Sequence, residues 1–170
     1  MVTIPKNRPG LGAEHPLCDK LQAVLILLFF VAWCVDTVSL FIFNYSTVVA
    51  GLFSSPLLLI PALFFISFGV YLITKSHNAI FGKLHDTPAL ITGGVYSWAR
   101  HPMYLGILLF CLGFWFMSLS LLALVILIAC FIFYDRMATY EEKDLVRLFG
   151  EEYSTYQNQV PKWLVGIWRR

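Results

Sequence analysis

The chain has 170 residues, of which 59% are hydrophobic and 13% charged, and its formal net charge is +2. Soluble domains are about 45–50% apolar and about 25% charged, so this composition excludes an ordinary soluble fold and indicates an integral membrane protein. A net charge this small, without a basic stripe, argues against a nucleic-acid partner. The length allows one domain, spanning residues 1–170.

Apolar segments in the first half of the chain predict two membrane-spanning helices. Residues 21–43 and 56–74 are both about as long as the 20 residues that a spanning helix needs. They follow a polar tail, residues 1–20, and precede a long polar connection, residues 75–102. Asp36 lies in the first span but near its far interface, where we expect it to reach water rather than to act in catalysis.

Two further apolar segments, residues 103–117 and 119–134, are separated by Ser118 alone and predict a tight helical hairpin. Sixteen residues reach about 24 Å, short of the roughly 30 Å hydrocarbon core. Gly106 and Gly113 are expected to let the two hairpin helices approach closely. The fold class predicted is therefore all-α and polytopic, with about four transmembrane helices.

Beyond the hairpin, we expect the last helix to continue into water from Asp135 to Phe149 and to stop at Gly150. Further helical turns over residues 151–159 would complete a helical tail. All twelve Lys and Arg residues fall in 1–20, 75–102 and 135–170. The positive-inside rule then places both termini and the long connection in the cytoplasm.

The first candidate for chemistry is the run Arg100-His101-Pro102-Met103-Tyr104. Proline is favoured at the first position of a helix, so the hairpin is expected to begin there. A helix start offers free N–H groups and a positive dipole end, which attract a carboxylate or phosphate. The alternative is a basic stop at a membrane boundary.

The second candidate is Glu141, in the helix over residues 135–149. A helical wheel places it within an apolar stripe, with Glu142 at the margin. The stripe consists of Met137, Ala138, Leu145, Leu148 and Phe149, and the opposite face carries Arg136, Tyr140, Lys143 and Arg147. A carboxylate on an apolar face needs a partner, which is either Arg100 or a cationic ligand such as an amino group.

Other features favour structural roles. Gly93 and Gly94 favour a plain turn over a close approach to a ligand. The four cysteines form no CxxC pair, and His77 and His85 have no metal-ligand spacing with His101, so neither a disulfide framework nor a metal site is predicted.

Together these motifs resemble the isoprenylcysteine carboxyl methyltransferase family and, more loosely, the membrane phospholipid methyltransferases. The resemblance covers residues 85–165. Its motifs are Gly94-Val95-Tyr96, Arg100-His101-Pro102-Met103-Tyr104-Leu105-Gly106, Glu141-Glu142, Leu148-Phe149-Gly150-Glu151-Glu152-Tyr153, Tyr156 and Val160-Pro161.

The resemblance implies that S-adenosylmethionine is the cofactor. It assigns the adenosine part to Pro88, Ala89, Leu90, Ile91 and Tyr96, the amino-acid part to His101, Pro102, Met103 and Tyr104, and the ammonium group to Glu141. Arg136 and Arg100 are the candidate catalytic residues. Arg136 is displaced by one residue from the family's substrate-facing arginine, and Met137 occupies the aligned position. A glutamine that the family has upstream of the adenosine-binding stretch is absent here, and Phe81 lies near that sequence position.

The function expected is methyl transfer to a lipophilic acceptor that enters from the bilayer, best represented by the carboxylate of a prenylcysteine-like substrate. A carboxylate is already ionised at neutral pH, so positioning would suffice without a general base. A phospholipid amine is the alternative acceptor. A small nicotinamide-dependent membrane reductase and a non-enzymatic adaptor are the other hypotheses.

Overall fold

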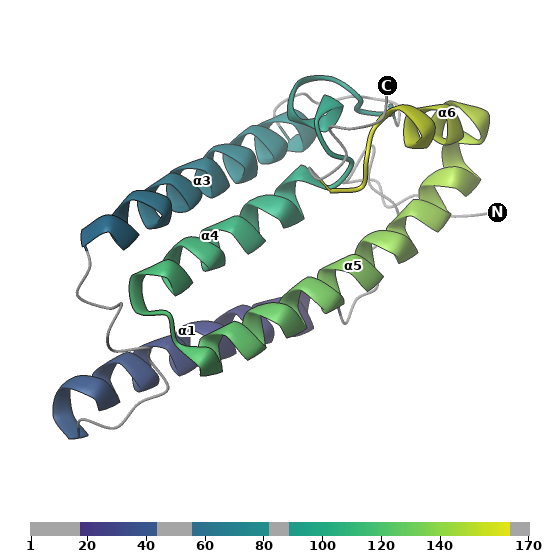
Figure 1. The fold of residues 1–170 in the computed structure, drawn as a ribbon. Helices are drawn as coiled ribbons and strands as arrows, with labels where there is room; N and C mark the ends of the chain where they lie inside the picture. The colour runs from purple at the N-terminus through teal and green to yellow at the C-terminus, as the bar shows by residue number, and fades with distance from the viewer. Residues whose placement is uncertain (1–17, 44–55, 82–88, 164–170) are drawn as a thin grey trace.

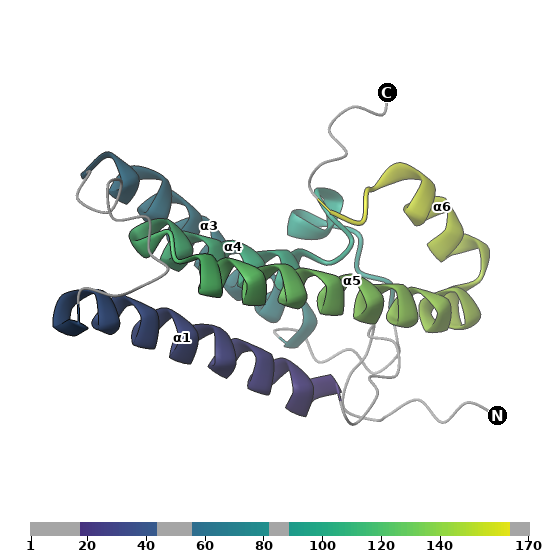
Figure 2. The same cartoon turned by 60° about the horizontal axis from the view of Figure 1, so that its bottom comes forward.

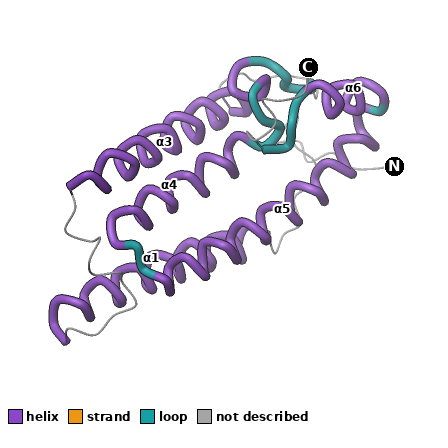
Figure 3. Tube along the Cα trace, viewed as in Figure 1, coloured by secondary structure: helices purple, strands orange, loops and turns teal. Residues whose placement is uncertain are grey.

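The computed structural model describes residues 18–43, 56–81 and 89–163, and the elements in these ranges are helices and connecting loops (Figures 1 and 3). Their order is α1 (Cys18–Phe43), the short 3-10 helix η1 (Pro56–Leu58), α3 (Leu59–Phe81), the 3-10 turn η2 (Gly94–Ser97), α4 (Pro102–Ser118), α5 (Leu121–Phe149) and α6 (Glu151–Gln159).

Three of the described helical segments are long and apolar enough to cross a membrane, namely Lys20–Phe43, Pro56–Phe81 and Leu121–Phe149. The fourth apolar helix, α4, is shorter, with 17 residues. The predicted all-α, polytopic membrane fold is therefore confirmed, including the short helix of the hairpin.

Helix α3 is longer than the sequence analysis predicted. Residues 75–81, which were expected to begin the polar connection, form its last two turns. Leu72, Ser76 and Ile80 recur at intervals of four and are all buried. Burial of this one face therefore stabilises the last two turns of α3, although Lys75 and His77 on the other faces are polar and exposed.

Gly106 and Gly113 were expected to bring the two hairpin helices close together, and this expectation is wrong. Both glycines face α3, so the close approach is between α3 and α4. A Cβ at Gly106 would lie 2.9 Å from the carbonyl oxygen of Gly69, and one at Gly113 would lie 2.8 Å from that of Ala62. Small residues let helices in lipid pack closely, and α3 and α4 use them along their whole contact. The hairpin helices α4 and α5 splay apart instead (Figure 1).

The turn of the hairpin consists of two residues, Leu119 and Ser120, between the end of α4 and the start of α5. Leu119 ends α4 in the left-handed conformation, with φ 51°. The hydroxyl of Ser120 caps α5 by accepting a hydrogen bond from the backbone N–H of Ala123. The same hydroxyl donates to the carboxylate of Asp36 on α1. Asp36 is buried, so the water contact expected for it is wrong, and it ties α1 to the hairpin turn.

Helix α5 continues without a break from the hairpin to Phe149, as predicted. Gly150 ends it with φ 58°, a conformation that glycine adopts readily. Helix α6 then turns back towards the start of α4 (Figure 2). The far end of α5, α6 and the loop before α4 thus meet at one end of the bundle.

Candidate functional site

The loop before α4 is shaped by its glycines and by two buried side chains. Gly94 has φ 64° and begins η2, where the hydroxyl of Ser97 donates to the Gly94 carbonyl at 2.7 Å. Val95 and Ala99 are buried beneath the loop. Gly93 and Gly94 are exposed and do not line the nearby pocket, which supports the plain-turn interpretation.

Helix α4 begins as predicted, with Pro102 at its first position and His101 as the preceding residue. The carbonyl of His101 accepts the first helical hydrogen bond, from the N–H of Leu105, at 3.1 Å. The His101 side chain makes no capping bond and turns instead towards α5. The first turn therefore presents its backbone N–H groups at the mouth of the hairpin.

Arg100 pairs with Glu142, not with Glu141. Its Nε lies 2.8 Å from Oε1 of Glu142, and its Nη1 donates to the carbonyls of Gln157 and Val160 at 3.0 and 2.7 Å. The backbone N–H of Arg100 also donates to the Pro161 carbonyl at 2.9 Å. One guanidinium thus joins the loop, α5 and the segment after α6.

Glu142 is the centre of this network. His101 Nε2 lies 3.1 Å from its Oε1, and Gln157 Nε2 donates to its Oε2 at 3.2 Å. Burial lowers the pKa of His101, an effect that the neighbouring Glu142 only partly opposes. A neutral imidazole donates through one nitrogen, and the shorter contact gives that hydrogen bond to Glu142.

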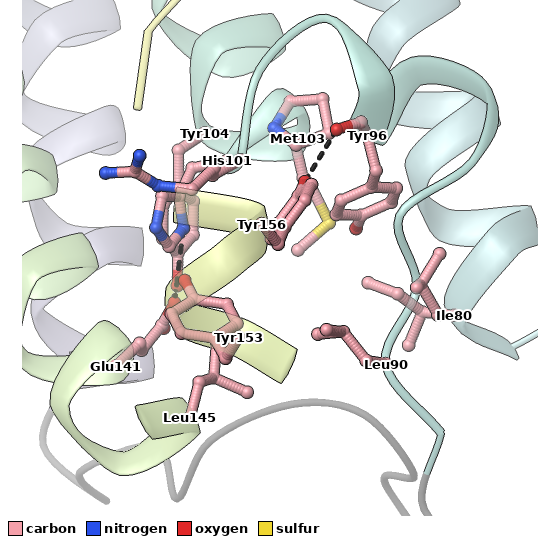
Figure 4. Close-up of a pocket in the computed structure, with 13 residues that line it drawn as sticks. Ile80, Leu90, Tyr96, His101, Met103, Tyr104, Glu141, Leu145, Tyr153 and Tyr156 are labelled. Carbon is pink, nitrogen blue, oxygen red and sulfur yellow. Dashed lines mark hydrogen bonds and ion pairs between the residues drawn. The ribbon is translucent and has the colours of Figure 1, made fainter. Parts of the chain in front are cut away.

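Glu141 faces the pocket itself. It is buried, accepts a hydrogen bond from the hydroxyl of Tyr104, and has Oε2 at 3.6 Å from Nδ1 of His101 (Figure 4). The rings of His101 and Tyr104 stack with an interplanar angle of 1°. Since a carboxylate can accept several hydrogen bonds, a cationic group entering the pocket can donate to Glu141 alongside Tyr104.

The rest of the pocket is apolar or aromatic. Met103 points into it from α4, and the hydroxyl of Tyr156 donates to the backbone carbonyl of Tyr96 at 2.6 Å (Figure 4). The empty space is about 560 Å³, counting the part open to solvent. The lining is Ile80, Leu90, Ile91, Tyr96, Arg100, His101, Pro102, Met103, Tyr104, Glu141, Leu145, Tyr153 and Tyr156.

Most of the predicted site residues therefore lie around one cavity. The exceptions are Ala89, which is exposed, Pro88, which falls outside the described residues, and Arg136, which is exposed and does not line the pocket. Sequence reasoning gave no ligand role to Leu145, Tyr153, Tyr156 or Ile80. The first belongs to the apolar stripe of α5 and the two tyrosines to the family motif, but Ile80 carries no signal in the sequence.

A second, wholly apolar groove begins one helical turn further along α4. It runs between α3, α4 and α5, with an empty space of about 940 Å³ counting its open side. Its lining is Phe64, Phe65, Phe68, Leu105, Leu108, Leu109, Leu112, Leu127, Phe131 and Trp163. Because His101 to Tyr104 line the pocket and Leu105 to Leu112 line the groove, one helix connects the two.

Fold and site together define a small membrane protein with a small-molecule pocket at one end and an apolar groove whose α4 residues follow those of the pocket. Residues 52–152 match the model of the phospholipid methyltransferase family, and the chain belongs to this family.

Curated relatives have the names that the resemblance predicted. The chain is 42% identical over 80 residues to a protein-S-isoprenylcysteine O-methyltransferase of Saccharomyces cerevisiae, a match covering 46% of the chain and 33% of that protein. The enzyme of the same name from Mus musculus is 36% identical over 89 residues, covering 52% and 31%. The chain thus spans about a third of the length of these relatives.

A bacterial relative has a different acceptor in its name. Methanethiol S-methyltransferase 1 of Bradyrhizobium diazoefficiens is 31% identical over 153 residues, covering 88% of this chain and 44% of that protein. Among solved structures, the eukaryotic intramembrane Ras methyltransferase ICMT matches with a TM-score of 0.66 and 21% identity, covering 91% of this chain and 54% of that one. At this identity the structural likeness concerns the fold.

Proposed function

We propose that this protein transfers a methyl group from S-adenosylmethionine to a lipophilic acceptor held in the membrane. The observation that carries the proposal is the meeting of an inward-facing carboxylate, a helix start and an apolar wall in one pocket, with an apolar groove lined by the next residues of α4. The cofactor supplies an electrophilic methyl group on a sulfonium centre.

The residues of the pocket fit a zwitterionic nucleotide. The buried Glu141 carboxylate suits an ammonium group, and the N–H groups at the start of α4 suit a carboxylate. Tyr104 holds Glu141 in place through the hydrogen bond from its hydroxyl, and the ring of His101 stacks on that of Tyr104. Pro102 and Met103 complete this part of the wall.

The adenosine part is assigned to the opposite wall. Leu90, Ile91 and Tyr96 offer apolar and aromatic surface there. Pro88 and Ala89 stay candidates for the same part of the cofactor from the resemblance alone. Tyr153 and Tyr156 are added to the set, because α6 brings both rings to the pocket.

The acceptor proposed is the carboxylate of a prenylcysteine-like molecule, with its hydrocarbon part in the groove. Catalysis then consists of desolvating the ionised carboxylate and aligning it, so the site needs no general base. Arg100 stays a candidate for orienting the acceptor, although Glu142 and three carbonyls already bind it. Arg136 stays a candidate from the resemblance alone, since its side chain is exposed on α5.

A thiol is a second candidate acceptor, favoured by the methanethiol S-methyltransferase that matches most of the chain's length. A thiol must lose its proton before it attacks, since its ordinary pKa is about 8.5. A phospholipid amine likewise requires a base. Both alternatives therefore predict a rate that rises with pH near neutrality, whereas a carboxylate acceptor predicts a flat profile there.

The pocket end carries Arg100, Arg136, Lys143, Arg147 and Lys162. By the positive-inside rule we assign this end and both termini to the cytoplasm. The cofactor would then enter from water, and the acceptor would arrive from the bilayer.

The test is cofactor binding by calorimetry in detergent, with Glu141→Gln against Glu152→Gln. The first variant removes the pocket charge, and a charge-assisted contact of about 1.5–3 kcal/mol corresponds to roughly 10- to 150-fold weaker binding. Glu152 is exposed on α6, so its variant should bind as the unaltered protein does. Equal affinity of both variants would remove Glu141 from the site.

The acceptor is tested separately with labelled cofactor. The unaltered protein is offered a prenylcysteine analogue, phosphatidylethanolamine or methanethiol, and transfer is followed across pH 6–9. Transfer to the carboxylate with a flat pH profile is expected. Cofactor binding followed by transfer to the thiol or amine alone would keep the methyltransferase proposal and replace its acceptor.

A further inference from the structure

Trp163 lines the groove and lies next to a residue of the pocket. Its side chain lines the groove, its ring centroid lies 5.7 Å from that of Phe131, and on the other side it lies 6.3 Å from the ring of His101. His101 lines the pocket. A molecule that extended from the groove towards His101 along this side of α4 would pass this indole.

The indole is held in place by α5. Its Nε1–H donates to Oδ1 of Asp135 at 3.0 Å, which gives the only polar group of the ring a partner. The neighbouring Lys162 donates from Nζ to Oδ1 and to the carbonyl oxygen of Asp135 at 2.7 and 2.8 Å, and to Oγ1 of Thr139 at 2.7 Å. Two consecutive residues are thus attached to the same turn of α5.

The preceding residues are attached as well. Arg100 binds the carbonyls of Gln157, Val160 and Pro161, as described above. The segment that carries Trp163 is therefore held by the loop before α4 at one point and by α5 at the next. Because the segment is held at both points, the indole that it carries can act as a fixed wall. Moving the indole would break several polar contacts at once.

We infer that Trp163 is a specificity-determining residue, whose indole limits the size of the acceptor end that can pass from the groove into the pocket. This inference rests on the proposed methyl transfer to a groove-bound acceptor. It assigns no chemical step to Trp163. It predicts that a small substituent beside the reactive group, such as the amino group of a prenylcysteine, passes the ring, whereas a bulky one, such as an isopropyl group, collides with it.

The orientation is tested by fluorescence, which needs no turnover. The probes are dodecanoate brominated at carbon 4, near the carboxylate, and dodecanoate brominated at carbon 12, at the far end. The head-end bromide should quench tryptophan emission of the unaltered protein more strongly than the tail-end bromide. Trp163→Phe should lose this difference, while Trp98→Phe should keep it, because Trp98 is 46% exposed and lines neither cavity. A difference that survives in Trp163→Phe would overturn the inference.

The size limit is tested by kinetics with dodecylthioacetate and its analogue carrying an isopropyl group beside the carboxylate. Trp163→Ala should raise kcat/KM for the branched analogue relative to the unbranched one by about tenfold, the lower end of what one apolar contact discriminates. Trp163→Phe should give a smaller change in the same direction. An unchanged ratio in both variants would overturn the inference.

Cofactor calorimetry separates the two proposals. Unaltered affinity in the Trp163 variants indicates that they are folded and that the change concerns the acceptor alone. If the unaltered protein neither binds the cofactor nor transfers a methyl group, the proposed function fails. The quenching experiment would still decide whether Trp163 faces the head of a groove-bound chain.

Discussion

Replacing Gly69 by alanine should force α3 and α4 apart. A Cβ at this position would lie 2.7 Å from the carbonyl oxygen of Gly106, 2.8 Å from the backbone nitrogen of Phe110 and 3.1 Å from its Cα. All three neighbours are backbone atoms of α4, so no rotamer change can make room. Non-bonded atoms are at their optimum near 3.5–4.0 Å, so the helices must separate by roughly 0.7–1 Å.

The magnitude follows from two opposing effects. A gap of this size forfeits about a quarter to a half of each contact's dispersion energy, and overpacking of this kind costs about 1–3 kcal/mol. Alanine gains up to about 1 kcal/mol over glycine in helix propensity. The net expectation is a loss of about 1–2 kcal/mol, or a fall in Tm of roughly 2–8 °C for a chain of this length.

The assay is thermal unfolding in detergent, followed by circular dichroism. Gly93→Ala is the matched control, because a Cβ there meets nothing within 4 Å and its φ of −92° suits alanine. The Gly69 variant should also bind the cofactor more weakly, since α3 carries Ile80 and α4 carries most of the pocket. A Tm equal to that of the control would refute the close contact of the two helices.

Two further predictions concern buried polar groups. Burial lowers the pKa of His101, so below pH 6.5 the unfolded state binds a proton that the folded state does not, and the free energy of unfolding should fall as pH drops from about 6.5 to 5. In denaturant titrations His101→Gln should reduce this slope, and a slope equal to that of the unaltered protein would contradict the assignment. Ser120→Ala should lower stability by about 2–3 kcal/mol, because one hydroxyl both caps α5 and binds the buried Asp36. Thermal unfolding should show little change for Ser97→Ala, whose exposed hydroxyl bonds within its own turn, and a similar small change at Ser120 would argue against the tie to α1.

The parts of the fold that depend on local chemistry could be predicted from the sequence. Pro102 begins α4 because its ring suits the first helical turn, and Gly150 ends α5 because it tolerates positive φ. The position of Glu141 on the buried face of α5 follows from the 3.6-residue period alone. These features need no knowledge of what packs against the helix.

Pairings between distant segments could not be predicted in the same way. Glu141 and Glu142 are neighbours in sequence, and only the crossing of α4 over α5 decides that Arg100 meets the second one. Gly106 is a sign of close helix packing, but the spacing of glycines does not say which helix approaches. The buried face of Ser76 and Ile80 was likewise hidden by exposed polar neighbours.

The apolar groove has no sequence signature at all. In a membrane protein the side chains that face lipid are of the same kind as those that line a cavity for a hydrocarbon chain. Leu109 and Phe131 therefore could not be separated from lipid-facing residues before the helices were arranged in space. The contact of Trp163 with His101 depends on the long-range attachment of Lys162 to α5.

The shortness of α4 affects the depth at which the proposed acceptor would meet the pocket. Seventeen residues rise about 26 Å, so a bilayer with a core of about 30 Å must either thin around this helix or leave its Pro102 end submerged below the head groups. In both arrangements the reactive end of the proposed acceptor would meet the pocket at the depth that this end already occupies in the bilayer. Extracting a hydrocarbon tail into water would cost about 0.8 kcal/mol for every methylene. A pocket that opens below the head groups avoids this cost.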